Sequence, residues 1–172
     1  MKQFILFVFL FAFISCSQEK EKEKEKVKMI LLEKADYSIS YPADWEVKTD
    51  EPRAEIFVCA PLDSQEDTFA DNFNMMKQNL LGKSIDMQLY DSISKSQILN
   101  AIGKNAIIDS KIEDGCATIL FKGPLDGRNL KWKQLYYIKN ETAYILTYTA
   151  EEIYFDKYSD IAESIFKSFK LK

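Results

Sequence analysis

Alternation of apolar and polar residues along the chain predicts a series of short β-strands. Tyr37, Ile39 and Tyr41 alternate with serines up to Pro42, which is the pattern of a half-buried strand that ends at a proline. Other segments are more continuously apolar and are bounded by turn residues. Strands are predicted over residues 37–41, 45–47, 54–60, 72–80, 105–114, 116–123, 130–139 and 142–150.

Turn residues separate the strands of the second half. Asp114-Gly115 is a strong signal for a tight hairpin between the strands on either side of it. Asn140-Glu141 predicts a second tight hairpin, whereas Gly123-Pro124 and Asp126-Gly127 predict a loop. The second half of the chain is therefore expected to be mostly antiparallel sheet.

Helical periodicity occurs in two places. Ser84 or Asp86 can cap a first helix, whose apolar stripe includes Leu89, Tyr90 and Ile93. A second helix is predicted over residues 155–169, with a stripe of Phe155, Tyr158, Ile161, Ala162, Ile165 and Phe169.

Residues 142–150, "TAYILTYTA", select the architecture. Both faces of this strand carry apolar bulk, with Ala143, Ile145 and Thr147 on one and Tyr144, Leu146 and Tyr148 on the other. Such a strand lies in the middle of a sheet that is covered on both sides. With two helices available as covers, the sequence predicts an α+β fold: a mostly antiparallel sheet flanked by helices on both faces, an α/β/α sandwich.

The first residues form a different kind of segment. Residues 4–14 are an unbroken apolar run behind Lys2, too short to span a bilayer but typical of the core of a signal peptide. The run ends in "FISC", which resembles a bacterial lipobox, where a cysteine is acylated and becomes the new N-terminus. We predict a lipoprotein signal peptide over residues 1–15 and lipid, such as palmitate, on Cys16. An ordinary signal peptide with an accidental cysteine is the alternative.

A charged run follows the cysteine. Glu and Lys alternate over residues 19–26, so that favourable i,i+3 pairs and unfavourable i,i+4 pairs nearly cancel in a helix. With no apolar residue to dock, the run is predicted to be solvated, and residues 16–34 together form the lipidated N-terminus and a flexible tether. Residues 35–172 have the length of one ordinary domain. Ser17 stands where many inner-membrane lipoproteins have Asp, so the resemblance favours the outer membrane, with the face left open.

Composition and charge narrow the classes of function. Hydrophobic residues make up 47% of the chain, which is enough for a core, and the net charge of −4 disfavours nucleic acid as a partner. The chain contains no histidine, which excludes nucleophile systems and zinc sites that depend on His. No phosphate-binding loop or nucleophile elbow is found in the sequence either, and we predict no cofactor.

Carboxylates are the main remaining candidates for chemistry. Asp63, Glu66, Asp67 and Asp71 cluster in one loop and could bind a hard cation such as Ca²⁺ or Mn²⁺. The first three of these acids could instead serve a hydrolase. Their spacing lacks the glycine and the final Glu of an EF-hand, so a solvated loop is favoured. Three other acids are expected to be exposed strand and turn residues: Asp109, Glu113 and Asp114.

Aromatic, basic and thiol side chains each have a structural interpretation beside a functional one. Four aromatics could line a ligand groove, although core packing is favoured: Trp45, Trp132, Tyr136 and Tyr137. Three lysines near Trp132 resemble a nucleic-acid strip but are interpreted as a solvated strand face: Lys131, Lys133 and Lys139. Cys59 and Cys116 could be bridged in an oxidising compartment, although two buried thiols are favoured. Residues 140–142 match a glycosylation sequon and are interpreted as a turn.

The motif "YSISYPADW", residues 37–45, resembles the opening of the PsbP-like family. The family pattern continues with an asparagine-containing strand and closes on a hairpin and a helix. Matching positions are Pro42, Trp45, Asn72, Asn74, residues 143–150, Phe155, Tyr158, Ile165, Ser168 and Phe169. The resemblance covers nearly all of residues 35–172 and implies an antiparallel α/β/α fold with binding or assembly roles that are mostly non-enzymatic.

Three hypotheses of function remain. The first is a bacterial envelope lipoprotein, not an enzyme, which is held on the membrane by the lipid on Cys16 and recognises an envelope protein or a small ligand. The second is an envelope hydrolase that depends on carboxylates, and the third is a purely structural envelope lipoprotein. Paired acids with raised pKa values in a pocket would favour the hydrolase, whereas an exposed aromatic groove would favour binding.

Overall fold

The computed structural model describes residues 27–62, 64–65 and 67–172. The expected signal peptide and most of the tether lie outside these residues. The described helices are α1 (Met87–Ala101) and α2 (Ser159–Ser168). The described strands are β1 (Met29–Glu33), β2 (Tyr37–Pro42), β3 (Glu46–Val47), β4 (Ala54–Cys59), β5 (Asn72–Asn79), β6 (Ile107–Glu113), β7 (Cys116–Leu125), β8 (Arg128–Lys139), β9 (Thr142–Glu151) and β10 (Lys170–Leu171).

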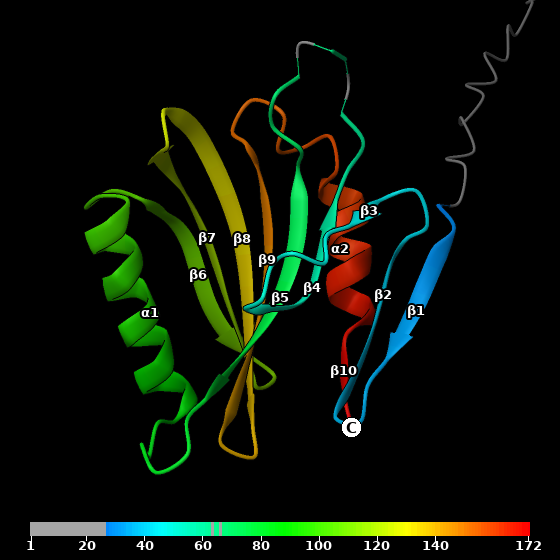
Figure 1. Cartoon of the computed structure of the whole chain (residues 1–172). Coiled ribbons are helices and arrows are strands. Elements are labelled where there is room, and N and C mark those ends of the chain that lie inside the picture. Colours follow the sequence, from blue (N-terminus) through cyan, green and yellow to red (C-terminus); the bar gives the residue numbers. More distant parts are fainter. Residues whose placement is uncertain (1–26, 63, 66) are drawn as a thin grey trace, which may run out of the picture.

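A seven-stranded antiparallel sheet forms the middle of the molecule (Figure 1). Its strands lie in the order β3-β4-β5-β9-β8-β7-β6, so that β9 joins the early strand β5 to the later strand β8. Every residue of β9 from Ala143 to Ala150 is buried. The prediction of a central strand covered on both faces is confirmed.

Two-residue turns connect β6 to β7, β7 to β8 and β8 to β9. Asp114, Asp126 and Asn140 begin these turns with φ of 50°, 50° and 49°. This left-handed conformation is one that Asp, Asn and Gly adopt most readily. The loop predicted between β7 and β8 is wrong in its length: β7 continues through Gly123-Pro124, and only Asp126-Gly127 turn, because an Asp-Gly pair suffices for a tight hairpin.

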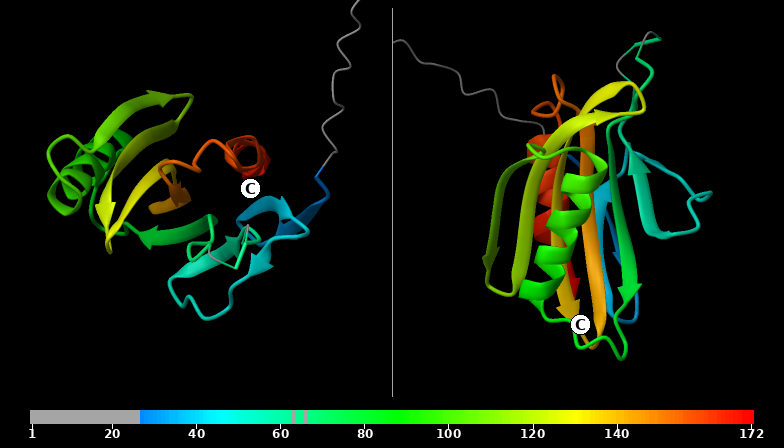
Figure 2. Two further views of the ribbon diagram at one scale, coloured as in Figure 1. Left: turned by 90° about the horizontal axis from the view of Figure 1, so that it is seen from above. Right: turned by 90° about the vertical axis from the view of Figure 1, so that its left-hand side faces the viewer.

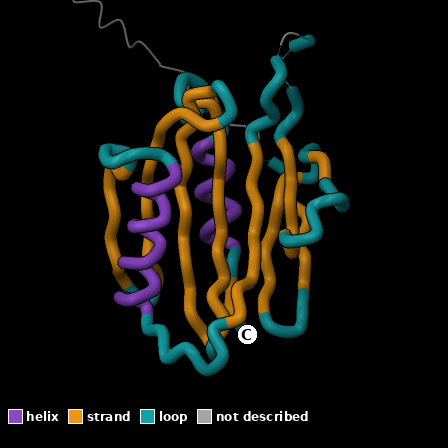
Figure 3. The backbone as a smooth tube through the Cα atoms, turned by 60° about the vertical axis from the view of Figure 1, so that its left-hand side comes forward, coloured by secondary structure: helices purple, strands orange, loops and turns teal. Residues whose placement is uncertain are grey.

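The sheet has a different layer on each face (Figure 2). Helix α1 covers one face, and the other carries α2 together with a three-stranded sheet in the order β1-β2-β10. Figure 3 shows the two helices on opposite sides of the strands. The predicted α+β sandwich is therefore confirmed. The sequence does not predict the second sheet, because β10 has only two residues and no recognisable period.

Strand β1 lies within the segment that the sequence assigns to the tether. The sequence predicts a solvated segment through Lys34, whereas Met29–Glu33 pair along β2, from Met29 with Pro42 to Glu33 with Ser38. Met29 and Leu32 pack partly against the main core. The segment is folded because β2 provides a partner strand, and the charge pattern gives no sign of this pairing.

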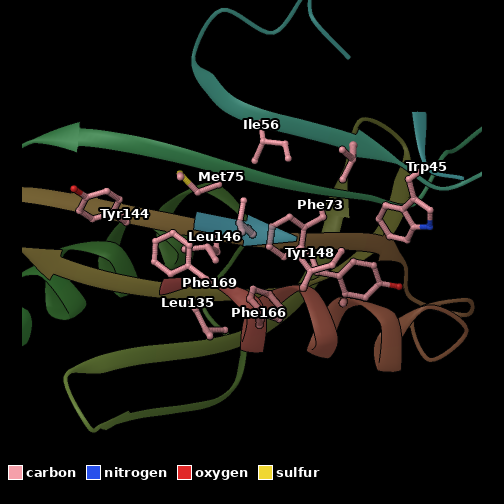
Figure 4. Packing of buried hydrophobic residues seen from close by; sticks show 14 of the residues in the cluster. Trp45, Ile56, Phe73, Met75, Leu135, Tyr144, Leu146, Tyr148, Phe166 and Phe169 are labelled. Atoms are coloured by element: carbon pink, nitrogen blue, oxygen red, sulfur yellow. The ribbon is translucent and has the colours of Figure 1, made fainter. Parts of the chain in front are cut away.

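The larger core lies between the seven-stranded sheet and α2 (Figure 4). Trp45 is only 4% exposed and meets the ring of Tyr158 edge-on, with centroids 5.7 Å apart. Phe73 and Phe166 make a similar contact at 5.0 Å. The predicted apolar stripe of the last helix is confirmed, although regular helix begins only at Ser159.

The smaller core lies beneath α1. Asp86 caps this helix, because its carboxylate accepts the backbone N–H of Leu89 at 2.8 Å. Tyr90 and Ile98 are buried against the sheet, whereas Leu89 is 47% and Ile93 38% exposed. The predicted stripe is thus wrong at Leu89 and Ile93, since the helix turns a face with Tyr90 and Ile98 to the strands.

Candidate functional site

A hollow of about 470 Å³ opens at the end of the sheet that is uppermost in Figure 1. We call it the Arg128 hollow. The turn between β7 and β8 and the end of β9 build it, because their register sets Leu130 of β8 opposite Glu151 of β9. It is lined by Asp126, Gly127, Arg128, Asn129, Glu151 and Ile153.

Arg128 is held in place by partners from two other segments. Its guanidinium donates to Glu151 Oε1 at 3.0 Å and to the Thr68 hydroxyl at 2.9 Å. The same group lies 5.5 Å from the ring centroid of Phe69, within cation–π range. A charged donor is therefore fixed at this end of the sheet, with the loop between β4 and β5 drawn towards it.

Asp71 lies beside this arrangement and is one of the acids that the sequence singles out. It is 8% exposed, and burial raises the pKa of its carboxyl to about 7. The backbone of Glu151 opposes this shift, while the negative charges of Asp67 and Glu151 add to it. Asp71 can thus gain or lose a proton near neutral pH.

Exposed apolar side chains surround the hollow. Ile153 is 80% exposed, Tyr154 50% and Leu125 42%. Isolated exposed apolar residues are ordinary, but a group around a fixed arginine is typical of a surface that contacts another molecule. The sequence does not predict this group, because Leu125 and Ile153 are separated along the chain and only the sheet register brings them to the same end.

The remaining predicted acids do not form a described metal site. Asp63 and Glu66 lie outside the described residues, as does Cys16. Asp67 accepts the backbone N–H of Phe69 at 3.0 Å within its own loop. Among the described residues, no three Asp, Glu or Cys side chains are placed to hold a metal ion. Asp109, Glu113 and Asp114 are exposed, as expected.

Most of the candidate aromatics belong to the cores. Trp45, Trp132 and Tyr136 are buried, and Trp132 stacks on Phe121 with centroids 4.9 Å apart. Tyr137 is half-buried. For these residues the core interpretation is confirmed, so the predicted aromatic groove is not formed by them.

The three lysines of β8 have partners in the fold. Lys133 forms an ion pair with Glu163 of α2, and Lys131 lies 4.3 Å from the ring centroid of Phe155. Lys139 donates to the carbonyl of Lys172 at 2.6 Å. The interpretation as a solvated strand face is therefore wrong for Lys131 and Lys133, which are half-buried between the sheet and α2.

The two cysteines of the folded part are free thiols on β4 and β7. Cys59 is buried and Cys116 half-buried. Burial raises the pKa of both thiols above its ordinary value, which keeps them protonated and weakly nucleophilic.

A second polar cluster surrounds Lys77 and is not apparent in the sequence. Lys77 Nζ lies 2.9 Å from Asp36 and 3.5 Å from Glu55, and Tyr144 donates to Asp36 at 2.9 Å. Burial lowers the pKa of Lys77, but the two carboxylates outweigh it and raise the pKa overall. The ammonium, whose hydrogen-bond partners come from separate segments, joins β5 to its surroundings and has no obvious ligand-binding role.

A family model described as PsbP-like protein matches residues 13–171. The chain belongs to the PsbP-like family. The motif residues of this PsbP-like chain are mainly structural: Pro42 and Trp45 are buried, and so is Phe169. Asn72 and Asn74 are half-buried on β5, where the Asn72 amide donates to the carbonyl of Ala70 at 3.2 Å.

Solved structures share the PsbP-like fold at low identity. PsbP (CyanoP) from Synechocystis sp. PCC 6803 matches with a TM-score of 0.56 and 13% identity, over 85% of this chain and 94% of that one. LpqN of Mycobacterium tuberculosis, described as involved in cell envelope biogenesis, matches with a TM-score of 0.54 and 11% identity. The match covers 86% of this chain and 92% of LpqN. Protein PA94 of Pseudomonas aeruginosa matches with a TM-score of 0.58 and 10% identity, over 81% of this chain and 94% of that one. At such identities the likeness shows the fold alone.

No curated protein matches the PsbP-like chain. Within the part of the chain that the structure describes, neither helix has the length and apolar character needed to cross a bilayer.

Proposed function

We propose that this PsbP-like chain is a lipoprotein of the bacterial envelope whose domain binds an envelope protein or a small ligand at the Arg128 hollow, without catalysing a reaction. The observation that carries the proposal is the hollow, which is lined by a fixed guanidinium and by the exposed Ile153, with the exposed Tyr154 next to it in the chain. Arg, Tyr and large apolar residues are the side chains that most often dominate binding energy at protein surfaces.

Membrane attachment through Cys16 fits this role. Two or three acyl chains, each buried methylene contributing about 0.8 kcal/mol, would hold the protein on its membrane. Strand β1 starts towards the end of the domain that carries the hollow (Figure 1). A tether entering at that end keeps the hollow near the membrane that holds the lipid, where envelope partners are concentrated. The absence of Asp at Ser17 favours the outer membrane, and the envelope role of LpqN is consistent with that location.

A carboxylate-dependent hydrolase is the second candidate, favoured by the raised pKa of Asp71. A carboxyl that titrates to about 7 suits a general acid or base. Hydrolysis, however, needs a second group for the nucleophile or oxyanion. Of the two described carboxylates that act on Asp71, Glu151 is engaged by Arg128 and Asp67 accepts the backbone N–H of Phe69. Binding without turnover is therefore the better-supported function.

Photo-crosslinking in intact envelopes tests the proposed surface. A photoreactive phenylalanine analogue at Ile153 should yield discrete adducts with a partner, because this side chain is 80% exposed at the edge of the hollow. Leu81 is a matched control, since it is 68% exposed and lines a different hollow, beside the turn between β8 and β9. Arg128→Ala should reduce the Ile153 adducts by about tenfold, the scale of one binding hot spot.

Two outcomes would contradict the proposal. The same adducts at positions 153 and 81 would mean that the hollow has no selectivity. Turnover of any substrate by the purified protein, abolished by Asp71→Asn in a protein that remains folded, would establish the hydrolase instead.

A further inference from the structure

Strand β6 is the last strand at one margin of the seven-stranded sheet. No described strand pairs with its outer edge, and Figures 1 and 2 show it at the margin beside α1. Ile108 is 47% and Ile112 37% exposed, and Asp109 and Lys111 are exposed as well. Free edges are usually protected against pairing by shortness, proline, charged side chains or a bulge, and β6 has its bulge at one end, between Ile107 and Asp109. This edge has seven residues, no proline, and charges of both signs.

The register of β6 with β7 determines which backbone groups point outward. Glu113 pairs with Cys116 across the two-residue turn, so these two residues exchange backbone hydrogen bonds. Alternate residues of an antiparallel strand point their N–H and C=O groups to opposite sides. Ser110 and Ile112 therefore offer theirs to the free edge. Ile108, the extra residue of the bulge between Ile107 and Asp109, has no partner residue on β7.

The sequence of this edge is complementary to itself. When two copies are placed antiparallel with Ser110 opposite Ser110, Ile112 lies opposite the bulge at Ile108 of the other copy. In the same register Asp109 faces Lys111, once on each side of the two-fold axis. The outward-pointing backbone groups of the two Ser110 residues then meet each other. We propose that a second copy of this chain binds here, so that the two sheets join edge to edge through β6.

Neighbouring registers lack this complementarity. Residues directly opposite each other lie on the same face of a sheet, so the two strands can slide past each other only in steps of two residues. Each such step moves the two-fold axis by one residue. A two-fold axis at Lys111 would oppose Lys111 to Lys111 and Asp109 to Glu113. An axis at Asp109 would oppose Asp109 to Asp109. Like charges directly opposite each other are unfavourable, so Ser110 is the centre that the side chains select.

The expected dimer is weak and leaves the Arg128 hollow open. One pair of short strands buries less area than a stable interface of about 1,200 Å². Confinement on a membrane raises the local concentration and favours such a contact. The hollow is lined by the turn between β7 and β8, the start of β8 and the segment from the end of β9, so the pairing does not depend on a ligand at the hollow and rests on the proposed function only for its confinement at a membrane.

Disulfide trapping of the full-length chain in cells tests this pairing. Ser110→Cys places two thiols opposite each other at a Cα separation of about 5.5 Å, which a disulfide can bridge. Mild oxidation of envelopes should give a covalent dimer. Glu113→Cys is the matched control on the same strand, because Glu113 does not face itself in this register. Both variants carry Cys116→Ser, since Cys116 lies opposite Glu113 on β7 and could otherwise capture the new thiol. Equal cross-linking of the two variants, or none with Ser110→Cys, would overturn the proposal.

Charge exchange identifies the register. In the Ser110→Cys background, Asp109→Lys and Lys111→Asp should each reduce the covalent dimer by about tenfold, because both symmetric pairs become repulsive. Co-expression of the two variants should restore a mixed dimer, since each Lys then faces an Asp again. Melting temperatures close to that of the wild type would show that both variants are folded. Failure of co-expression to restore the dimer would reject the Ser110-centred register.

Discussion

At the scale of single residues, Asp71 shows how the fold changes the chemistry of a side chain. An exposed aspartate titrates near 3.8, whereas burial raises the pKa of Asp71 to about 7. Between these two values the folded chain retains a proton that the unfolded chain has lost. Stability linked to this group is therefore fully present below about pH 4 and is lost as the pH rises to about 7.

Asp71→Asn should remove this dependence. The wild-type melting temperature is expected to fall, relative to that of the variant, between about pH 4 and pH 7, and to run parallel to it above pH 7. Thermal unfolding of both proteins across this range measures the difference. Parallel curves throughout would mean that the Asp71 carboxyl is solvated and titrates normally.

The residues of the candidate site were predictable only in part. The sequence singles out Asp71 as a member of an acidic cluster, although it predicts that the loop carrying this cluster is solvated. Arg128 and Glu151 give no such signal. They are separated by two long strands, and their ion pair exists only because β8 and β9 pair in one register. Sequence reasoning identifies residue types and periods, but not which distant residues a register brings together.

At the scale of elements, predictions succeed where the apolar pattern extends over a whole strand or helix. They fail where contacts with distant segments determine the structure. The two-sided apolar character of β9 is intrinsic to its sequence and correctly indicates a central strand. The stripe of α1 is ambiguous, because Leu89 and Ile93 satisfy a helical period as well as Tyr90 and Ile98 do. The pairing of β1 with β2 could not be predicted, since β1 follows a charged run and its partner strand provides most of its support.

The junction between α1 and β7 depends on the absence of a side chain at Gly123. A Cβ atom at this position would collide with Cγ2 of Ile102, which caps the C-terminus of α1. Gly123→Ala should therefore destabilise the protein by about 1–3 kcal/mol, the usual cost of overpacking. Chemical denaturation measures this loss.

Removal of the colliding methyl provides the control for Gly123. The double variant Gly123→Ala/Ile102→Ala should recover part of the loss relative to the sum of the single variants, because the two side chains then no longer compete for space. Simple additivity of the two substitutions would show that the cost arises elsewhere, for example in the backbone of β7.

At the scale of the whole molecule, the chain combines a folded PsbP-like domain with an N-terminal segment whose sequence predicts a lipoprotein signal peptide. Lys77 is ion-paired with Asp36 and Glu55 beside a hollow of about 450 Å³, and Arg128 is paired with Glu151 in a hollow that the exposed Ile153 lines. The proposed function divides its roles between separate parts of the chain, with attachment proposed at Cys16 and recognition proposed at the hollow.

Acylation of Cys16 is the prediction that belongs to this scale. Cells supplied with a labelled fatty acid should incorporate it into the wild-type protein and not into Cys16→Ser, since only this cysteine follows the lipobox-like sequence. Cys59→Ser and Cys116→Ser should retain the label, because both thiols are protonated within the fold. Equal labelling of wild type and Cys16→Ser would refute the membrane anchor.

The position of β9 in the sheet determines when a growing chain can fold. This strand is among the last to be synthesised, yet it holds β5 and β8 together, and without it the seven-stranded sheet divides into two separate pieces. Strand β10, which completes the small sheet, comes from the final residues. A ribosome-bound chain that lacks these segments has no closed core to form. The topology thus delays closure of the seven-stranded sheet until β9 has been synthesised and can pair with both β5 and β8.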